Sequence, residues 1–432
     1  MASPKLPLDR RQIMAGLGAA ALAPVWAVEG FAQAALALQV KAGSLALRSN
    51  APNTPVWLLQ GPELRFKRGE TLDVAFSNEL PAPVALNWRG IDGVPAAGPL
   101  AGRPPLAAGA KEAFQLPLRH AGTFLCDLNL LGDGQPTPSQ ARALIVQENE
   151  GVTVDRDEVL LIEDWRIRPD GTALAPGSAS GEAVSVHTIN GQTSFELSAR
   201  PNARVRLRLI SGCQRDVIAV KLDGLEVRVM AIDSQPSEPF QARNGALVLS
   251  PGSRVDAFID MTKAAGTETP ILLHDGKEAR PIGKIRVSGE PVRPAPLPPA
   301  PPLPSNGLPE QLDLKNASRF DLALGGPGDW GPPAKFAATA PPAFRVKSGR
   351  TVVLALTNRT AIATVFHLHG HHFRLLDRLD DGWKPFWLDT LAIEPGQTQR
   401  IAFRTEYPGR YLIESVTADW AAPRLVRWYM IE

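Results

Sequence analysis

Short runs in which apolar and polar residues alternate follow one another along most of this chain. Typical examples are Val205-Arg-Leu-Arg-Leu209 and Val255-Asp-Ala-Phe-Ile259. Alternation with a period of two places one set of side chains on each face of a strand. Glycine, proline and asparagine punctuate these runs, and long helical periodicity is scarce. The pattern therefore predicts an all-β chain built from sandwiches.

The chain also contains internal repeats. Residues 66–78 match residues 346–358 at an offset of 280, and a weaker copy covers residues 202–211. Each copy is a turn followed by an alternating strand, and each is followed later by a pair of glycines at similar spacing. Repetition of one supersecondary unit indicates related domains. We predict three of them, covering residues 36–148, 151–290 and 307–432.

Two segments outside these domains have compositions of their own. Residues 291–306 carry eight prolines and are expected to form an extended, semi-rigid linker. At the other end, Arg10 and Arg11 precede an apolar run from Ile13 to Ala27, and an A-x-A cleavage site follows at 32–34. This is the layout of a secretory signal, and the arginine pair resembles a twin-arginine (Tat) signal. We expect residues 1–34 to direct export to the periplasm, and no other stretch is long and apolar enough to span a membrane.

Composition narrows the possible functions. With 46 basic and 44 acidic residues, the net charge of +2 argues against a nucleic-acid binder. Two cysteines exclude a disulfide scaffold, and Cys126 and Cys213 are expected to be separate buried thiols, the alternative being a disulfide. Four of the seven histidines lie between positions 367 and 372. The isolated His120, His187 and His274 are expected to be ordinary surface or packing residues.

The segment around the clustered histidines resembles a known motif. Residues 365–373, Val-Phe-His-Leu-His-Gly-His-His-Phe, look like the third copper motif of multicopper oxidases. Asp164-Trp165 and Leu249-Ser-Pro-Gly-Ser-Arg-Val-Asp256 in the middle of the chain are also similar to signatures of that family. The resemblance covers essentially the whole chain after the signal. It implies three cupredoxin-like, Greek-key β-sandwich domains in tandem.

The copper ligands of that family do not carry over onto this sequence. The internal repeat aligns residues 87–89 with 367–369 and residues 127–129 with 414–416, so the four positions that would each be His-x-His can be compared. Only His367 and His369 are histidines, and the other six cluster positions are Asn87, Arg89, Asp127, Asn129, Glu414 and Val416. The positions that would hold the mononuclear copper are Thr364, Ser415, Trp420 and Leu425. Neither copper site is expected to form, because a blue-copper site needs a thiolate and imidazoles.

Two interpretations of the former copper positions follow. In one, Arg89 bonds the Asp127 and Glu414 carboxylates, and this buried network links the first and third domains in place of the metals. In the other, His367 and His369 hold a single copper or zinc ion with Asp127 or Glu414 as an oxygen donor. We expect no cofactor in the first case and one metal ion in the second.

The function implied by the resemblance is that of an exported multicopper-oxidase-like protein without enzymatic activity. Members of this family that lack copper ligands include a Tat-exported cell-division protein, so we expect a monomer that contacts an envelope protein in cell division or envelope stress. The alternative is an oxidoreductase with one residual metal at His367 and His369. Tryptophans crowd the last domain, at positions 330, 383, 387, 420 and 428. They could form an exposed binding patch, but core packing is expected, with Trp420 filling the lost copper pocket.

Overall fold

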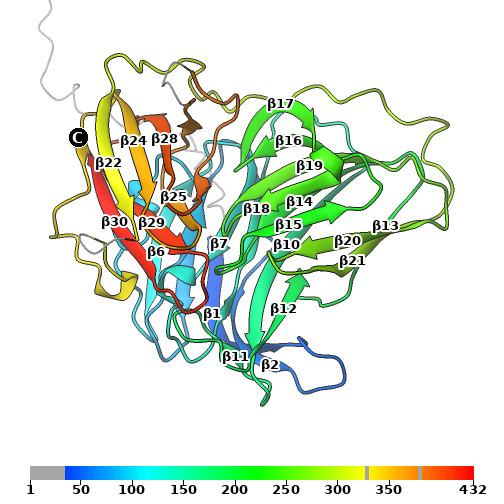
Figure 1. Ribbon diagram of the computed structural model, residues 1–432, viewed down its shortest axis with the longest axis horizontal. Coiled ribbons are helices and arrows are strands. Elements are labelled where there is room, and N and C mark those ends of the chain that lie inside the picture. Colours follow the sequence, from blue (N-terminus) through cyan, green and yellow to red (C-terminus); the bar gives the residue numbers. More distant parts are fainter. Residues whose placement is uncertain (1–34, 326–329, 378–381) are drawn as a thin grey trace, which may run out of the picture. The chain divides into compact units, whose positions relative to one another are not determined.

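The computed structural model describes residues 35–325, 330–377 and 382–432, and residues 35–432 form one compact unit. The signal predicted at residues 1–34 lies outside the described residues. Regular structure in the described part is almost entirely strand (Figure 1), with short 3-10 turns at η1 (Pro95–Ala97), η2 (Asn129–Leu131), η3 (Arg243–Gly245) and η4 (Pro333–Lys335). No described helix is long and apolar enough to cross a membrane. The prediction of an all-β chain is confirmed.

The first group of strands forms two sheets around one core. The five-stranded sheet has the order β6 (Lys111–Pro117), β4 (Thr71–Asn78), β1 (Leu36–Leu45), β2 (Thr54–Gln60) and β8 (Ser139–Gln140). The four-stranded sheet has the order β3 (Arg65–Lys67), β9 (Arg142–Gln147), β7 (Gly122–Asp127) and β5 (Asn87–Arg89). Val40 and Phe76 from one sheet pack in the same core as Phe124 from the other. The alternation predicted from the sequence thus gives the inward face of a sandwich.

The second group, drawn in green in Figure 1, has the largest hydrophobic core. Its seven-stranded sheet has the order β11 (Ala173–Leu174), β10 (Arg156–Ile167), β14 (Arg204–Ser211), β19 (Arg254–Asp260), β16 (Arg228–Ile232) and β17 (Gln235–Gln241), with β12 (Val184–Ile189) also paired to β10. Its five-stranded sheet has the order β13 (Phe195–Ala199), β21 (Ala279–Val287), β20 (Glu268–His274), β15 (Ile218–Leu222) and β18 (Ala246–Leu249).

The third group repeats the design of the first. One sheet has the order β22 (Ser318–Leu324), β24 (Thr351–Asn358), β28 (Thr398–Arg404) and β26 (Arg374–Leu375). The other has the order β23 (Arg345–Val346), β30 (Arg424–Ile431), β29 (Gly409–Thr417), β25 (Thr364–Leu368) and β27 (Thr390–Ile393). Aromatic rings fill much of its core, including Phe344, Phe403 and Tyr429.

The internal repeat found in the sequence corresponds to a repeated structure. The matched segments contain the eight-residue strands β4 and β24, each following a glycine with positive φ, Gly69 at 93° and Gly349 at 79°. Each strand ends at a buried asparagine, Asn78 or Asn358, whose amide donates to the carbonyl four residues later, at 2.9 and 2.8 Å. The asparagines are therefore retained because they close the turn after the strand. The exact limits of the three domains stay a prediction.

The segment predicted as a proline-rich linker is held against the folded groups by hydrogen bonds to its backbone. Arg204 donates to the carbonyls of Leu297 and Pro298, at 3.3 and 2.6 Å. At its end, the buried Asn306 accepts from the Ala121 amide at 2.9 Å and donates to the Ala121 carbonyl at 2.8 Å. The linker is therefore fixed by its side-chain partners as well as by the stiffness of proline.

A buried carboxyl group lies where the first and second groups of strands meet. Glu163 on β10 is only 2% exposed, and its Oε1 accepts from the backbone amide of Ala141 at 2.8 Å. Burial raises the pKa of Glu163 to about 8, although hydrogen bonds from Ala141 and Gln140 oppose this. Because water is excluded, the neutral acid is the favoured form in the folded protein at neutral pH.

We predict that this carboxyl makes the folded protein less stable as the pH rises. The unfolded chain loses the Glu163 proton near pH 4.5, whereas the folded protein keeps it until about pH 8, so the contribution is complete below the lower value and lost toward the higher. In urea unfolding, we expect the free energy of unfolding of Glu163→Gln to exceed that of wild type as the pH rises between these values, by up to about 4 kcal/mol. The exposed Glu150→Gln serves as control, and equal pH slopes for all three proteins would contradict the prediction.

Candidate functional site

The register of two antiparallel strand pairs brings the predicted site residues together. In the first group β5 pairs with β7, so that Asn87 lies opposite Asp127. In the third group β25 pairs with β29, so that His367 lies opposite Glu414. Side chains two apart on a strand share a face, which places Arg89 beside Asn87 and His369 beside His367.

Arg89 joins the two pairs through a buried network. Its Nε donates to Asp127 Oδ2 at 2.6 Å, and its Nη1 donates to Glu414 Oε1 at 2.9 Å. The second nitrogen, Nη2, donates to Glu414 Oε2 at 3.3 Å. The side chains of Asp127 and Glu414 are 0% exposed and that of Arg89 is 4% exposed. The predicted Arg-carboxylate network between the first and third groups is confirmed in its geometry.

A second arginine, which the sequence analysis missed, completes the network. Arg424 on β30 is 2% exposed and its Nη1 donates to Glu414 Oε2. Its position across β29 and β30 places it next to Val416 in the register, close to Glu414. The signal that could have found it is the pairing of the consecutive strands β29 and β30, whose register brings Arg424 close to Glu414, ten residues away.

The neighbouring cations decide the charge state of Glu414. Burial alone raises the pKa of a carboxyl, but Arg89 and Arg424 outweigh that effect and hold the pKa of Glu414 well below its ordinary value. Burial also lowers the pKa of Arg89, and the Asp127 and Glu414 carboxylates more than reverse this shift. Glu414 and Arg89 are therefore both charged at neutral pH.

The two candidate metal ligands have different surroundings. His369 Nε2 donates to Glu414 Oε1 at 2.6 Å, so it belongs to the network. His367 Nδ1 donates to the Thr390 hydroxyl at 2.8 Å, because that hydroxyl itself donates to Asp389. His367 Nε2 is buried without a hydrogen-bond partner, and burial lowers the pKa of this histidine well below its ordinary value. His367, His369 and Glu414 together present ligand atoms within 4.8 Å of one another.

The other positions aligned with cluster ligands are buried, but their surroundings differ. Asn87 is fully buried, and neither atom of its amide has a hydrogen-bond partner. Asn129 accepts from Gln214 Nε2 at 2.7 Å, which links η2 to the second group of strands. Val416 is a buried apolar residue of β29.

Three of the positions aligned with mononuclear copper ligands lie on paired strands, Thr364 on β25, Ser415 on β29 and Leu425 on β30. Thr364 bonds to Asn358, Ser415 lies opposite Leu425 in the β29–β30 register, and the Ser415 hydroxyl is buried without a partner. Trp420 is 5% exposed and packs under Arg166, whose guanidinium carbon lies 4.6 Å from the ring centre. Among the described atoms at these four positions there is no thiolate or imidazole.

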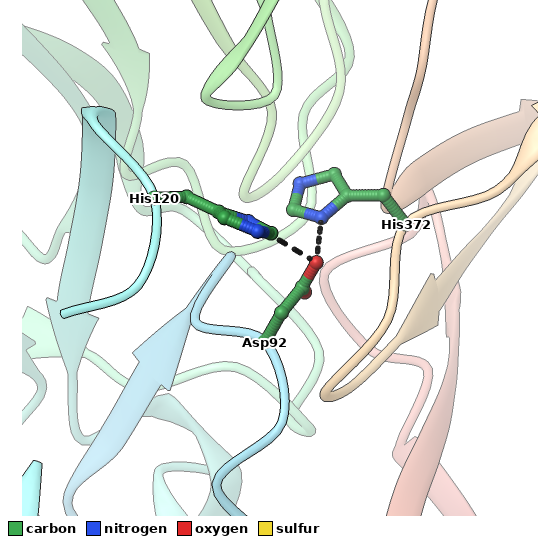
Figure 2. Close-up of side chains that lie close together, drawn as sticks. All are labelled: Asp92, His120 and His372. Carbon is green, nitrogen blue, oxygen red and sulfur yellow. Dashed lines mark hydrogen bonds and ion pairs between the residues drawn. The ribbon is translucent and has the colours of Figure 1, made fainter. Parts of the chain in front are cut away.

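A second cluster of titratable groups contains residues that the sequence analysis treated separately. Figure 2 shows His120 and His372 pointing at the carboxylate of Asp92 from different parts of the chain. His372 Nδ1 lies 2.7 Å and His120 Nδ1 lies 3.5 Å from Asp92 Oδ2. Asp92 follows β5, His120 lies in the turn between β6 and β7, and His372 follows β25. His120 is therefore a packing histidine, and chain folding places it beside a carboxylate.

Backbone contacts build this second cluster. Asp92 and Gly370 form an isolated parallel bridge, and the Gly93 amide donates to the Gly370 carbonyl at 3.0 Å. Gly370 has a φ of 76°, and a Cβ there would meet the Tyr411 ring at 2.3 Å. Glycine is therefore required at the step that turns the chain from His369 toward His372.

The two histidines of the cluster differ in charge. Burial lowers the pKa of His372, but Asp92 more than reverses this and raises it to about 9. Burial lowers the pKa of His120 to about 4, and the opposing effect of Asp92 is too weak to restore it. His372 Nε2 also donates to the Asp233 carbonyl at 2.6 Å.

Arg254 connects this region to all three groups of strands. From β19 its Nε donates to the Thr123 carbonyl at 3.2 Å, and its Nη2 donates to Asp389 Oδ2 at 2.5 Å. Thr123 belongs to the first group and Asp389 to the third. The guanidinium is 0% exposed, so its only neutralisation comes from the carboxylates it contacts, Asp389 and, at 3.8 Å, Asp233.

The two cysteines and most of the tryptophans of the last group of strands are buried. Cys126 and Cys213 are free, buried thiols, as predicted. The alternative of an exposed tryptophan patch is wrong, because Trp387, Trp420 and Trp428 are buried. The remaining two, at positions 330 and 383, are half-buried.

Two other histidines are buried in specific contacts. The His187 side chain is 0% exposed and lies 3.6 Å from Asp216. Its Nδ1 accepts from Arg280 Nη2 at 2.9 Å, so it is a packing residue that takes part in an ion-pair cluster. His371 lies 2.8 Å from the Tyr429 hydroxyl, which donates to the His369 carbonyl.

The chain is similar to known proteins both in sequence and in fold. Two family models, both described as multicopper oxidase, match residues 311–432 and 156–268. The multicopper oxidase MmcO of Mycobacterium tuberculosis is 23% identical over 421 residues, covering 82% of this chain and 78% of MmcO. The cell division protein FtsP of Pectobacterium atrosepticum is 29% identical over 264 residues, covering 55% of this chain and 52% of FtsP. A multicopper oxidase structure from Pseudomonas thermotolerans superposes with a TM-score of 0.78 at 23% identity, covering 92% of this chain and 98% of that one.

Removing the arginine at the centre of the network tests its structural role. Arg89→Met is expected to lower the free energy of unfolding by roughly 3–5 kcal/mol, because the buried Asp127 carboxylate loses its cationic partner and Glu414 loses one of its two arginines. The matched control is Arg156→Met, which removes a half-exposed pair with Glu158 and should cost at most about 1 kcal/mol. Urea unfolding at pH 7 measures the free energy of unfolding of both variants. Equal losses would show that the buried network contributes no more to stability than a half-exposed ion pair.

Proposed function

The chain belongs to the multicopper oxidase family, and we propose that it is a member that has lost both copper sites and acts as a non-catalytic interaction or structural protein in the periplasm. The observation that carries this proposal is the Arg89 network. Fixed positive charge lies at positions that align with copper ligands, and Arg89 contacts two more such positions through Asp127 and Glu414.

The donor set does not fit a group of three copper ions. Two imidazoles remain at the aligned positions, and one of them, His369, already donates to Glu414. The Glu414 carboxylate is held by Arg89 and Arg424, so a cation there would have to displace two guanidinium groups. Copper centres in proteins rely on several imidazole and thiolate ligands, and this combination offers too few.

The mononuclear position fits copper no better. Hydroxyl, indole and aliphatic side chains stand at the aligned positions, at Thr364, Ser415, Trp420 and Leu425. None of these is a soft ligand, and the site has no sulfur to bind cuprous or cupric ion. The protein therefore lacks the mononuclear copper that would accept an electron from a substrate.

The physiological role is proposed from similarity together with the missing ligands. FtsP, which is named as a cell division protein, is among the relatives of this chain. We propose a corresponding role in cell division or envelope stress, with export directed by residues 1–34 and with contact to an envelope protein as the mode of action. Similarity of fold alone does not specify a role, so the ligand positions are the stronger support.

One observation favours the alternative of a residual metal-dependent oxidoreductase. His367 Nε2 is buried without a partner, and an orphaned imidazole nitrogen is a potential metal ligand. Against it, Arg89 and Arg424 place positive charge next to Glu414, the oxygen donor such a site would use. This electrostatic cost makes the alternative the weaker one.

The two functions differ in oxidase activity. We expect protein produced in copper-supplemented medium to oxidise a phenolic substrate no faster than an equal concentration of free copper, as measured by oxygen uptake. His367→Gln is the matched variant, since it removes the orphaned nitrogen and leaves the Arg89 network intact. Copper-dependent oxidation by wild type that His367→Gln abolishes would establish the alternative instead.

A test in cells addresses the proposed role. Deleting the gene in the source organism is expected to lengthen the cells under envelope stress, and both wild type and His367→Gln should restore normal length. Restoration by the variant is expected because a contact function does not use the imidazole. Normal length in the deletion strain would remove the proposed role in division, and failure of a folded His367→Gln protein to rescue would point to metal chemistry.

A further inference from the structure

The strongest unexplained feature of the structure is the cluster of Asp92, His120 and His372. One carboxylate oxygen and two imidazole nitrogens converge there, each pair within 4.8 Å. In a tetrahedral site with metal–ligand bonds of about 2.1 Å, ligand atoms lie about 3.4 Å apart. The observed separations from Asp92 Oδ2 are 3.5 Å to His120 Nδ1 and 2.7 Å to His372 Nδ1.

The surroundings of His372 are those of a metal-ligating histidine. Its Nε2–H donates to the Asp233 carbonyl at 2.6 Å, which fixes the ring and directs Nδ1 toward Asp92. A hydrogen bond from the far nitrogen to a carbonyl is the usual support of such a ligand. Asp233 comes from the second group of strands, so the support is independent of the ligands themselves.

The Asp92 carboxylate has spare capacity for a cation. It is 7% exposed, its Oδ1 is buried without a hydrogen-bond partner, and its ion pairs within the described residues are with His120 and His372. This is the main difference from the cluster at Glu414, whose carboxylate already bonds two guanidinium groups. A divalent cation at Asp92 therefore has no guanidinium group to displace from the carboxylate, although Arg68, Arg119 and Arg254 lie near enough to lower the pKa values of the two histidines.

There is room for an ion and a route to it. All three side chains line a cavity of about 10 Å³, which suits roughly one water-sized particle. The exposed residues Arg404 and Glu406 line the same cavity, so it leads toward solvent.

The Gln235 amide closes the remaining side of the cluster. Its Nε2 lies 3.1 Å from His120 Nδ1 and 3.5 Å from His372 Nδ1. Asn306 donates to Gln235 Oε1 at 3.0 Å and is itself oriented by the Ala121 backbone, so Gln235 presents N–H groups to the site.

We propose that Asp92, His120 and His372 bind one divalent metal ion of the zinc type, with water as the fourth ligand. Two nitrogen donors and one carboxylate oxygen are a donor set that zinc accepts. Two ligands come from the first group of strands and one from the third, so the ion would join them. On binding, His372 Nδ1 releases its proton to solvent and the ion takes the place of that proton beside Asp92. The proposal does not depend on the function proposed above, because it requires no redox chemistry.

Zinc titration of the purified, chelator-treated protein tests the site. Isothermal titration calorimetry with zinc chloride is expected to give one ion per chain, and His120→Ala should weaken binding roughly 100-fold or more, since even supporting residues cost 10–100-fold. Cobalt(II) in place of zinc should give the visible absorption of tetrahedral coordination, lost in His120→Ala. His274→Ala, at the exposed end of β20, is the matched control and should bind as wild type does.

Each result decides the assignment. His120→Ala changes a turn residue next to β7 and leaves the His372–Asp92 contact in place, and circular dichroism verifies its fold. Absence of zinc and cobalt binding by the folded wild type would overturn the proposal. So would unchanged affinity in His120→Ala, or loss of binding in His367→Gln, because that loss would move the ion to the cluster at Glu414. Oxidase activity is not a readout here, so failure of this site leaves the proposed function standing.

Discussion

Pairing of buried charge is the constraint on which this structure depends. Arg89 and Arg254 are almost completely removed from water, and each reaches carboxylates that belong to other groups of strands. An unpaired ion in such a place costs several kcal/mol, so the strand groups can dock only where the charges meet. The net gain in stability is modest, because desolvation offsets most of the attraction. What the pairs specify is the relative placement of the groups.

The same constraint applies at the positions that align with the copper ligands of the multicopper oxidase family. In the family a metal cluster supplies positive charge between the first and third domains. In this chain Arg89, at an aligned position, and Arg424, on the neighbouring strand β30, lie around Glu414 and provide positive charge there. The remaining histidines then take different parts: His369 belongs to the network, His367 keeps an unpartnered nitrogen, and His372 turns toward Asp92.

Much of the fold and of the first cluster could be predicted from the sequence because both are carried by local patterns. Alternating runs predicted strands, and the repeat of residues 66–78 at 346–358 reappears as β4 and β24 with the same asparagine turn. The repeat also aligned Arg89 with His369 and Asp127 with Glu414, so their convergence followed once the fold was assumed. Arg424 and the partners of His120 were missed, because Arg424 reaches Glu414 only through the β29–β30 register and the contacts of His120 are made by turns without a motif.

The sequence by itself determined the strand periodicity, the family resemblance and the identity of the side chains at each aligned copper position. Tertiary structure alone decided which of these side chains form ion pairs and which have no hydrogen-bond partner. Asp92, His120 and His372 are unremarkable in sequence, yet the Asp92–Gly370 bridge and the turn before β7 bring them within hydrogen-bonding range or close to it. The physical reason is that electrostatic and ligand interactions act over a few ångströms in space, and chain separation gives no measure of that distance.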